Sequence, residues 1–170
     1  MWAEYIMNKC IKWLDLIISN MLIFLMFCIV LAVSWQVFSR YILHAPSSGS
    51  EEFARFLLIW IGLLGAVYSY RTKSHLGLNI FTNKMPAKKK RLAELFSHSM
   101  VFIFSFCALV LGGSNLVTLT FNPVQTSASL GLSVGYIYTV LPISGVMFCI
   151  YSVNEMFILL HSNTDFDGEM

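Results

Sequence analysis

The chain has 170 residues, of which 57% are hydrophobic and 12% charged, with a formal net charge of +2 and a mean hydropathy of +0.71. A soluble domain of this length carries about a quarter charged residues, because its surface must stay in water. The composition excludes such a domain and predicts a single all-α integral membrane domain over residues 1–170. The small net charge also argues against a nucleic-acid partner.

The first membrane span is predicted at about residues 14–39. No charged residue occurs from 16 to 39, a run of 24, and about 20 apolar residues in a helix cross the hydrocarbon core. A cleaved signal peptide is the alternative, but its apolar run would be shorter and its leading stretch would lack acids such as Glu4 and Asp15. An uncleaved helix is the preferred interpretation.

The second span, at about residues 52–71, is short. Only 15 uncharged residues separate Arg55 from Arg71, which gives about 22 Å of helix against a core of about 30 Å. The helix must therefore include the preceding charged turn, with an N-cap expected within residues 48–51, or let both arginines reach toward water. Small residues at helical spacing favour close packing of this helix against another: Gly62, Gly65 and Ala66.

Two further spans are predicted at about residues 95–119 and 135–160. Glu94 and Glu155 enclose 60 residues without a formal charge, divided by a polar connection at 122–133. Gly112, Gly113 and Pro142 are expected to loosen or bend these helices, which neighbours in a bundle tolerate.

The distribution of basic residues predicts that the N and C termini both face the cytoplasm. Seven of the eleven Lys and Arg residues lie in the connection from Arg71 to Arg91, and Lys9 and Lys12 precede the first span. Cytoplasmic connections carry such an excess. Apolar residues between 76 and 85 predict a short amphipathic helix on the cytoplasmic surface between helices two and three, with a plain connector as the alternative.

A charged group is predicted near the outer ends of the first two spans, with Trp60 on the same segment: Arg40, Glu51, Glu52 and Arg55. Glu51 precedes Arg55 by one helical turn, the favourable order for an ion pair. An isolated charge near hydrocarbon costs several kcal/mol, so these residues are expected to act as an electrostatic clip between helices or as an interface with another subunit or a binding protein. A substrate or ion pathway is the alternative.

On the cytoplasmic side, Arg71, His75 and Glu155 are expected to make polar contacts, and Glu155 could pair with Arg71 or with lysines of the middle connection. The histidines show no haem-type or metal-type spacing, and the four cysteines form no C-x-x-C pair. No nucleophile constellation, phosphate-binding loop or pair of mid-membrane carboxylates is found. The sequence thus predicts no enzyme, no cofactor and no metal, and little capacity to bind a hydrophilic solute alone.

Several motifs follow one another through residues 35–76: W-Q-V-F-S-R-Y at 35–41, E-E-F-A-R at 51–55, Trp60, Gly65 and R-T-K-S-H at 71–75. Their order resembles the small membrane subunit (Q-type, small permease) of tripartite ATP-independent periplasmic (TRAP) transporters, and the sequence is most similar in look to sialic-acid members. Asn79 departs from the pattern, since the family commonly has aspartate there.

The resemblance implies a division of labour. A large multi-span membrane subunit would carry the substrate and sodium sites, and a periplasmic substrate-binding protein would deliver an organic acid such as sialic acid or a C4-dicarboxylate. The present chain would be a non-catalytic scaffold in the bacterial inner membrane, in contact with membrane lipids, packing on the large subunit and helping to dock the binding protein. Two alternatives remain open: a self-sufficient homodimeric four-helix transporter and a haem-binding membrane anchor.

Overall fold

The computed structural model describes residues 2–45, 47–72 and 87–161, and the regular secondary structure of these residues is helical. The elements in chain order are α1 (Trp2–Tyr41), α2 (Ser48–Arg71), α4 (Ala87–Phe104), the π-helical segment η1 (Ser105–Gly112), α5 (Gly113–Phe121), α6 (Val134–Tyr138) and α7 (Val140–His161). The amphipathic helix expected between helices two and three falls outside the described residues, as does His75.

Among the described residues, four helical stretches are long and apolar enough to cross a membrane: Ile11–Tyr41, Ser48–Arg71, Lys89–Phe121 and Val134–His161. This confirms the predicted all-helical architecture with four helices that are able to cross a membrane. Each predicted range lies inside one stretch, and the third stretch joins α4, η1 and α5. The side of the membrane on which each connection lies stays a prediction.

The start of α2 explains how a short uncharged run becomes a long helix. Ser47 caps the helix by accepting a hydrogen bond from the Ser50 backbone N–H at 3.4 Å, and Glu51 adds negative charge to the first turn. The cap lies one residue before the predicted 48–51, because Ser47 has the extended backbone that a cap requires. With 24 residues, α2 is about 36 Å long and can cross the core.

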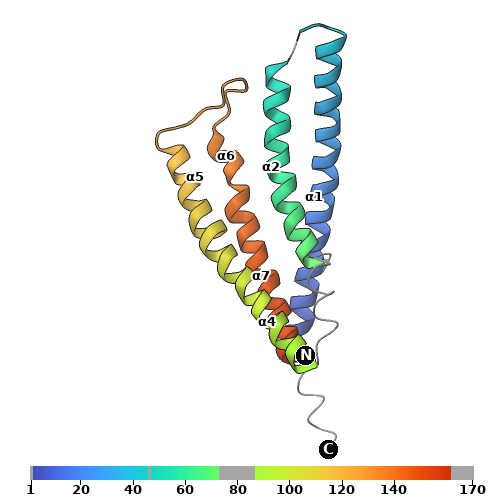
Figure 1. Ribbon diagram of the computed structural model, residues 1–170, viewed down its shortest axis with the longest axis vertical. Helices are drawn as coiled ribbons and strands as arrows, with labels where there is room; N and C mark the ends of the chain where they lie inside the picture. The colour runs from blue at the N-terminus through green and yellow to red at the C-terminus, as the bar shows by residue number, and fades with distance from the viewer. Residues whose placement is uncertain (1, 46, 73–86, 162–170) are drawn as a thin grey trace, which may run out of the picture.

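The helices form two pairs, α1 with α2, and α4–η1–α5 with α6–α7 (Figure 1). The pairs converge at the lower end of Figure 1, where the N terminus lies, and diverge toward the upper end. At the lower end α7 contacts both α2 and α4. The buried core lies between α1, α2 and α7 and consists of these apolar residues: Ile11, Ile18, Val67 and Tyr151 in one cluster, and Leu25, Leu57, Leu64 and Val140 in the next.

Glycine allows the closest contact inside the second pair. A Cβ added at Gly145 of α7 would lie 2.7 Å from the Leu109 Cβ and 3.0 Å from the Val110 backbone nitrogen in η1, so α7 has no room for a side chain where it meets η1. A Cβ at Gly62 or Gly65 of α2, in contrast, would meet no heavy atom within 4 Å. The small-residue face of α2 therefore faces away from the other described helices.

The helices of the second pair are irregular near the predicted glycine and proline positions. The π-helical segment η1 ends at Gly112, and helix α5 begins at Gly113. The last span is interrupted at Thr139, so that Pro142 lies in the first turn of α7, where its missing N–H removes no helical hydrogen bond. The interruption of the helix thus lies before the proline.

Candidate functional site

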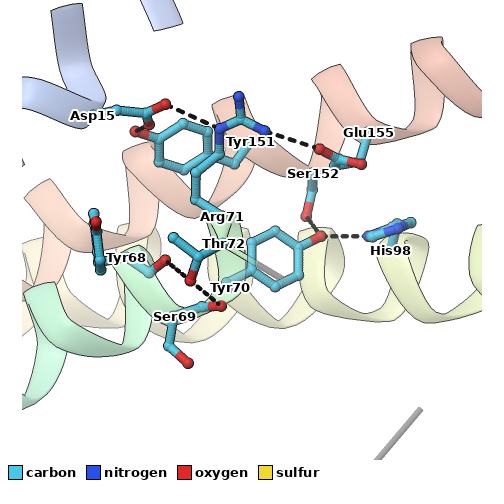
Figure 2. Close-up of polar contacts among 10 residues, drawn as sticks. All are labelled: Asp15, Tyr68, Ser69, Tyr70, Arg71, Thr72, His98, Tyr151, Ser152 and Glu155. Carbon is cyan, nitrogen blue, oxygen red and sulfur yellow. Dashed lines mark hydrogen bonds and ion pairs between the residues drawn. The ribbon is translucent and has the colours of Figure 1, made fainter. Parts of the chain in front are cut away.

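A cluster of polar side chains joins four helices at the lower end of the bundle. We call it the Arg71 cluster, and it comprises these residues: Asp15 of α1, Tyr70 and Arg71 of α2, His98 of α4, and Tyr151, Ser152 and Glu155 of α7. Figure 2 shows that the side chains point toward one another from the facing sides of their helices. The sequence places Arg71 in the last turn of α2, where positive charge is favourable.

Arg71 lies between two carboxylates from different helices. Its Nε donates to Oδ2 of Asp15 at 3.2 Å, and its Nη1 donates to Oε1 of Glu155 at 3.2 Å. Tyr151 completes the arrangement because its hydroxyl donates to Oδ1 of Asp15 at 2.8 Å, while the Arg71 guanidinium carbon lies 5.8 Å from the centre of its ring. One cation therefore ties α1, α2 and α7 together.

Tyr70, the residue before Arg71, makes a second set of contacts. Its hydroxyl oxygen lies 2.6 Å from Nδ1 of His98 and 2.9 Å from Oγ of Ser152. Its ring also packs edge-on against Phe148 at 5.5 Å between centroids. Because His98 belongs to α4, these contacts connect the first helix pair to both helices of the second (Figure 2).

The burial of the Arg71 cluster makes its pairing energetically important. The Glu155 side chain is 6% exposed, whereas those of Arg71 and Asp15 are 28% and 30% exposed. Removing the partner of a buried charge costs far more than removing the partner of an exposed one. The cluster is therefore built to hold helices together, and its charges are directed at one another.

Tyr70→Phe is expected to lower the free energy of unfolding by about 1–2 kcal/mol. The substitution removes a hydroxyl from between His98 and the fully buried Ser152, whose oxygen then loses a partner. Thermal unfolding of the detergent-purified chain measures the effect. Tyr68→Phe is the control, because Tyr68 is exposed on the same helix turn; equal losses for both variants would contradict this account.

The charged residues predicted at the outer end lie at the upper end of the bundle and form separate contacts. Glu51 and Arg55 pair within α2 at 3.4 Å, with side chains 52% and 69% exposed. Glu52 accepts the Ser129 backbone N–H at 2.9 Å, so it joins α2 to the connection at 122–133 rather than to α1. Arg40 is exposed at the end of α1. Within the part of the chain that the structure describes, no ion pair joins Arg40 to the other three.

Trp60 and Ala66 lie partly buried on α2. Trp60 packs against the apolar cluster formed by Leu25, Leu57, Leu64 and Val140, and so contributes to the packing of the bundle. Ala66 is half-buried beside Gly65. Among the described residues, no polar contact joins Trp60 or Ala66 to the charged group at the upper end, so a role at a subunit interface stays a prediction for Trp60.

Five members of the Arg71 cluster were not among the polar contacts predicted from the sequence: Asp15, Tyr70, His98, Tyr151 and Ser152. Asp15 was only the last charge before an apolar run, and the tyrosines were part of apolar segments. A signal did exist. Tyr151 and Glu155 are four residues apart and share a helix face, and Asp15, Arg71 and Glu155 stand near the same predicted membrane boundary.

The sequence matches a known family over most of its length. The family model described as "Tripartite ATP-independent periplasmic transporters, DctQ component" covers residues 29–161. The chain belongs to this family. As a DctQ-family protein it is a membrane-embedded transport component and not an enzyme, which confirms the resemblance found in its motifs.

Named relatives of this DctQ-family chain include proteins of two lengths. The sialic acid TRAP transporter small permease protein SiaQ of Vibrio cholerae is 30% identical over 137 residues, which cover 80% of this chain and 77% of the relative. The sialic acid TRAP transporter permease protein SiaT of Haemophilus influenzae is 30% identical over 142 residues, 82% of this chain and 21% of the relative. The chain thus spans about a fifth of the length of SiaT.

A second long relative shows the same relation. The isethionate TRAP transporter permease protein DctMQ of Oleidesulfovibrio alaskensis is 29% identical over 126 residues, which cover 70% of this chain and 20% of the relative. In both long permeases, a region similar to the DctQ-family chain forms one part of a much longer polypeptide.

Proposed function

We propose that this chain is the non-catalytic scaffold subunit of a sodium-coupled, binding-protein-dependent TRAP transporter for organic acids, with sialic acid as the first candidate substrate and C4-dicarboxylates as the second. In this proposal a large membrane subunit carries the substrate and the sodium ions. The chain holds that subunit in place. The observation that carries the proposal is the Arg71 cluster, in which the half-buried Asp15 of α1 and Arg71 of α2 and the buried Glu155 of α7 bind one another.

A static role follows from how these charges are used. A solute site needs polar groups that exchange protein partners for the solute, and a moving helix must break and remake its contacts. Here Arg71 contacts two carboxylates at once, and the buried core above it is formed by apolar residues such as Leu25, Leu64 and Val140. This arrangement supports a bundle that keeps one conformation while a partner moves.

Association with a large subunit is supported by the long relatives, in which a similar region belongs to the same polypeptide as the rest of a permease. We place the contact on the small-residue face of α2. Gly62 and Gly65 leave open space beside the backbone, and glycines in membrane helices allow another helix to approach closely. Arg55 and Leu58 continue the same face toward the upper end of the bundle and are exposed.

The proposed membrane is the bacterial inner membrane, with both termini in the cytoplasm. Basic residues near the ends of the predicted spans support this orientation. The upper end of the bundle is then periplasmic. Arg40, the Glu51–Arg55 pair and the Glu52–Ser129 contact lie at that end, where they are available to help dock a periplasmic binding protein.

Reconstitution into liposomes tests the scaffold role. The chain alone is expected to transport neither sialic acid nor a C4-dicarboxylate. A sodium gradient should drive uptake only when the large subunit and the binding protein are also present. Sodium-driven uptake by the chain alone would instead support the self-sufficient homodimer, and a haem absorption band in the purified protein would support the redox anchor.

Gly62→Leu is expected to reduce co-purification of the large subunit by at least about tenfold, because a side chain on this face keeps the partner helix at a distance. The stability of the isolated chain should stay within about 0.5 kcal/mol of the unmodified protein, since a Cβ added at Gly62 meets no heavy atom within 4 Å and the side chain lies on an exposed face. Val30→Phe, an apolar exchange at an exposed position of α1 away from this face of α2, serves as the control. Unchanged co-purification would place the partner on another face.

A further inference from the structure

An open groove of about 550 Å³ follows the first turns of α4 at the lower end of the bundle. It is lined by Lys89, Leu92, Ala93, Leu95, Phe96 and Ser99. These residues share one stripe of the helix, and the ten helical steps from Lys89 to Ser99 measure about 15 Å. Lys89 stands at one end of the groove, and apolar side chains form most of the remainder.

The charges around this groove are unfavourable for the helix itself. Lys89 is followed by Lys90 and Arg91, and the first turn of α4 contains no acidic residue. Cations at a helix N-terminus oppose the macrodipole. Arg91 is directed elsewhere, because its Nη2 donates to the Leu160 backbone carbonyl of α7 at 3.4 Å. Lys89 is exposed and lines the groove, so an anion placed there would be attracted both by the side chain and by the helix end.

The walls of the groove require that this anion carry an apolar chain. Leu92 is 69% exposed and Phe96 is 64% exposed, and Met100 and Ile103 continue the exposed apolar stripe along the same side of the helix. An acyl chain lying along α4 would cover this stripe while its headgroup reached Lys89. Basic sites at membrane-helix ends bind anionic lipid headgroups in this manner.

We propose that the groove on α4 binds one anionic phospholipid, with its phosphate at Lys89 and an acyl chain against Leu92 and Phe96. The proposal needs only that the chain spans a membrane, so it stands or fails separately from the scaffold role. In this proposal the charge of the surrounding lipid influences the position of α4 in the membrane. The groove lies at the same end of the bundle as the Arg71 cluster, which joins α4 to α2 and α7.

Native mass spectrometry of the full chain in detergent tests the site, with phosphatidylglycerol and phosphatidylcholine of identical acyl chains as probes. Phosphatidylglycerol should bind at least about fivefold more tightly, and Lys89→Gln should remove about that factor while leaving phosphatidylcholine binding unchanged, because one cation near an anionic headgroup contributes a factor of this size. Lys89→Arg should retain the preference. Leu92→Ser should weaken both lipids equally.

Lys12→Gln is the matched control, since Lys12 is an exposed cation on α1 at the same end of the bundle as the groove. The phosphatidylglycerol affinity of this variant should stay within about twofold of that of the unmodified chain. Equal binding of the two lipids, or equal losses for Lys89→Gln and Lys12→Gln, would overturn the proposal. Displacement of the lipid by glycerol phosphate would also overturn the proposal, because contact of the acyl chain with the groove would then contribute nothing to the affinity. So would loss of the lipid on assembly with the large subunit, which would show that protein covers this face.

Discussion

Arg71→Ala is expected to lower the free energy of unfolding of the isolated chain by about 3 kcal/mol, the lower end of the range for breaking a buried ion pair. The variant leaves Glu155, whose side chain is 6% exposed, without the guanidinium that contacts it at 3.2 Å. The variant also removes the ion pair between Asp15 of α1 and Arg71 of α2. The lower end of the range applies because Asp15 is 30% exposed and water can solvate it.

Unfolding in mixed micelles of a mild detergent and sodium dodecyl sulfate measures this loss. Arg55→Ala is the matched control on the same helix, because the Glu51–Arg55 pair is more than half exposed on both sides and should cost less than about 1 kcal/mol. Arg55→Ala is instead expected to weaken assembly with the large subunit more than it changes substrate preference. Equal stability losses for the two arginine variants would contradict the assignment of the Arg71 cluster as the internal brace.

A double variant separates the pair from the packing of Arg71. Replacing Glu155 by Gln in the Arg71→Ala background removes the charge of the buried carboxylate that has lost the Arg71 guanidinium, and should restore part of the lost stability. If Glu155→Gln instead added its full cost to that of Arg71→Ala, the two side chains would be energetically independent. The short contact between them would then contribute little.

Gly145→Leu is expected to destabilise the chain by about 3 kcal/mol or more, the upper end for overpacking a tight interface. The first atom of the new side chain would already lie 2.7 Å from the Leu109 Cβ and 3.0 Å from the Val110 nitrogen, so the second helix pair must separate. The same unfolding experiment detects the loss.

Alanine substitutions at Gly145 and Gly62 provide a control, because they are expected to change the stability of the chain differently. Gly145→Ala should still destabilise the chain, although alanine favours a helix over glycine by about 1 kcal/mol. Gly62→Ala should be neutral or stabilising by up to that amount, because its Cβ meets no heavy atom within 4 Å. If both alanine variants moved stability in the same direction, the close contact between α7 and η1 would not be a tight one in the membrane protein.

The membrane-crossing helices could be predicted from the sequence because hydrocarbon imposes a length and an absence of charge on each span. The start of α2 was also foreseeable, since Arg55 and Arg71 stand too close together for an uncharged helix to cross. The widened turns of the π-helical segment η1 could not be predicted from the sequence. No residue type in 105–112 requires a π-helix, and the close contact that this segment makes with α7 at Gly145 becomes visible only in the folded chain.

The Arg71 cluster was only partly foreseeable for a different reason. Sequence gives the depth of a residue in the membrane, and depth alone made Glu155 a possible partner of Arg71. Which partner is chosen depends on how each helix is rotated about its own axis. Asp15 and Tyr151 join the cluster because the packing of α1, α2 and α7 turns them toward Arg71. The glycine face of α2 illustrates the same limit, since its small residues predict close packing against another helix but not which one, and in the structure they face away from the other described helices.

The contact between Asp15 and Arg71 places the lower ends of the uncharged runs of α1 and α2 at the same depth in the membrane. The two uncharged runs that start from this depth differ in length. The uncharged run of α1 holds 24 residues, about 36 Å, whereas that of α2 holds 15, about 22 Å. A lipid bilayer adjusts its thickness to the apolar length of the helix that it surrounds. The bilayer is thus expected to thin beside α2 unless a partner shields the charged turn at Glu51–Arg55, which makes assembly sensitive to the acyl-chain length of the host membrane.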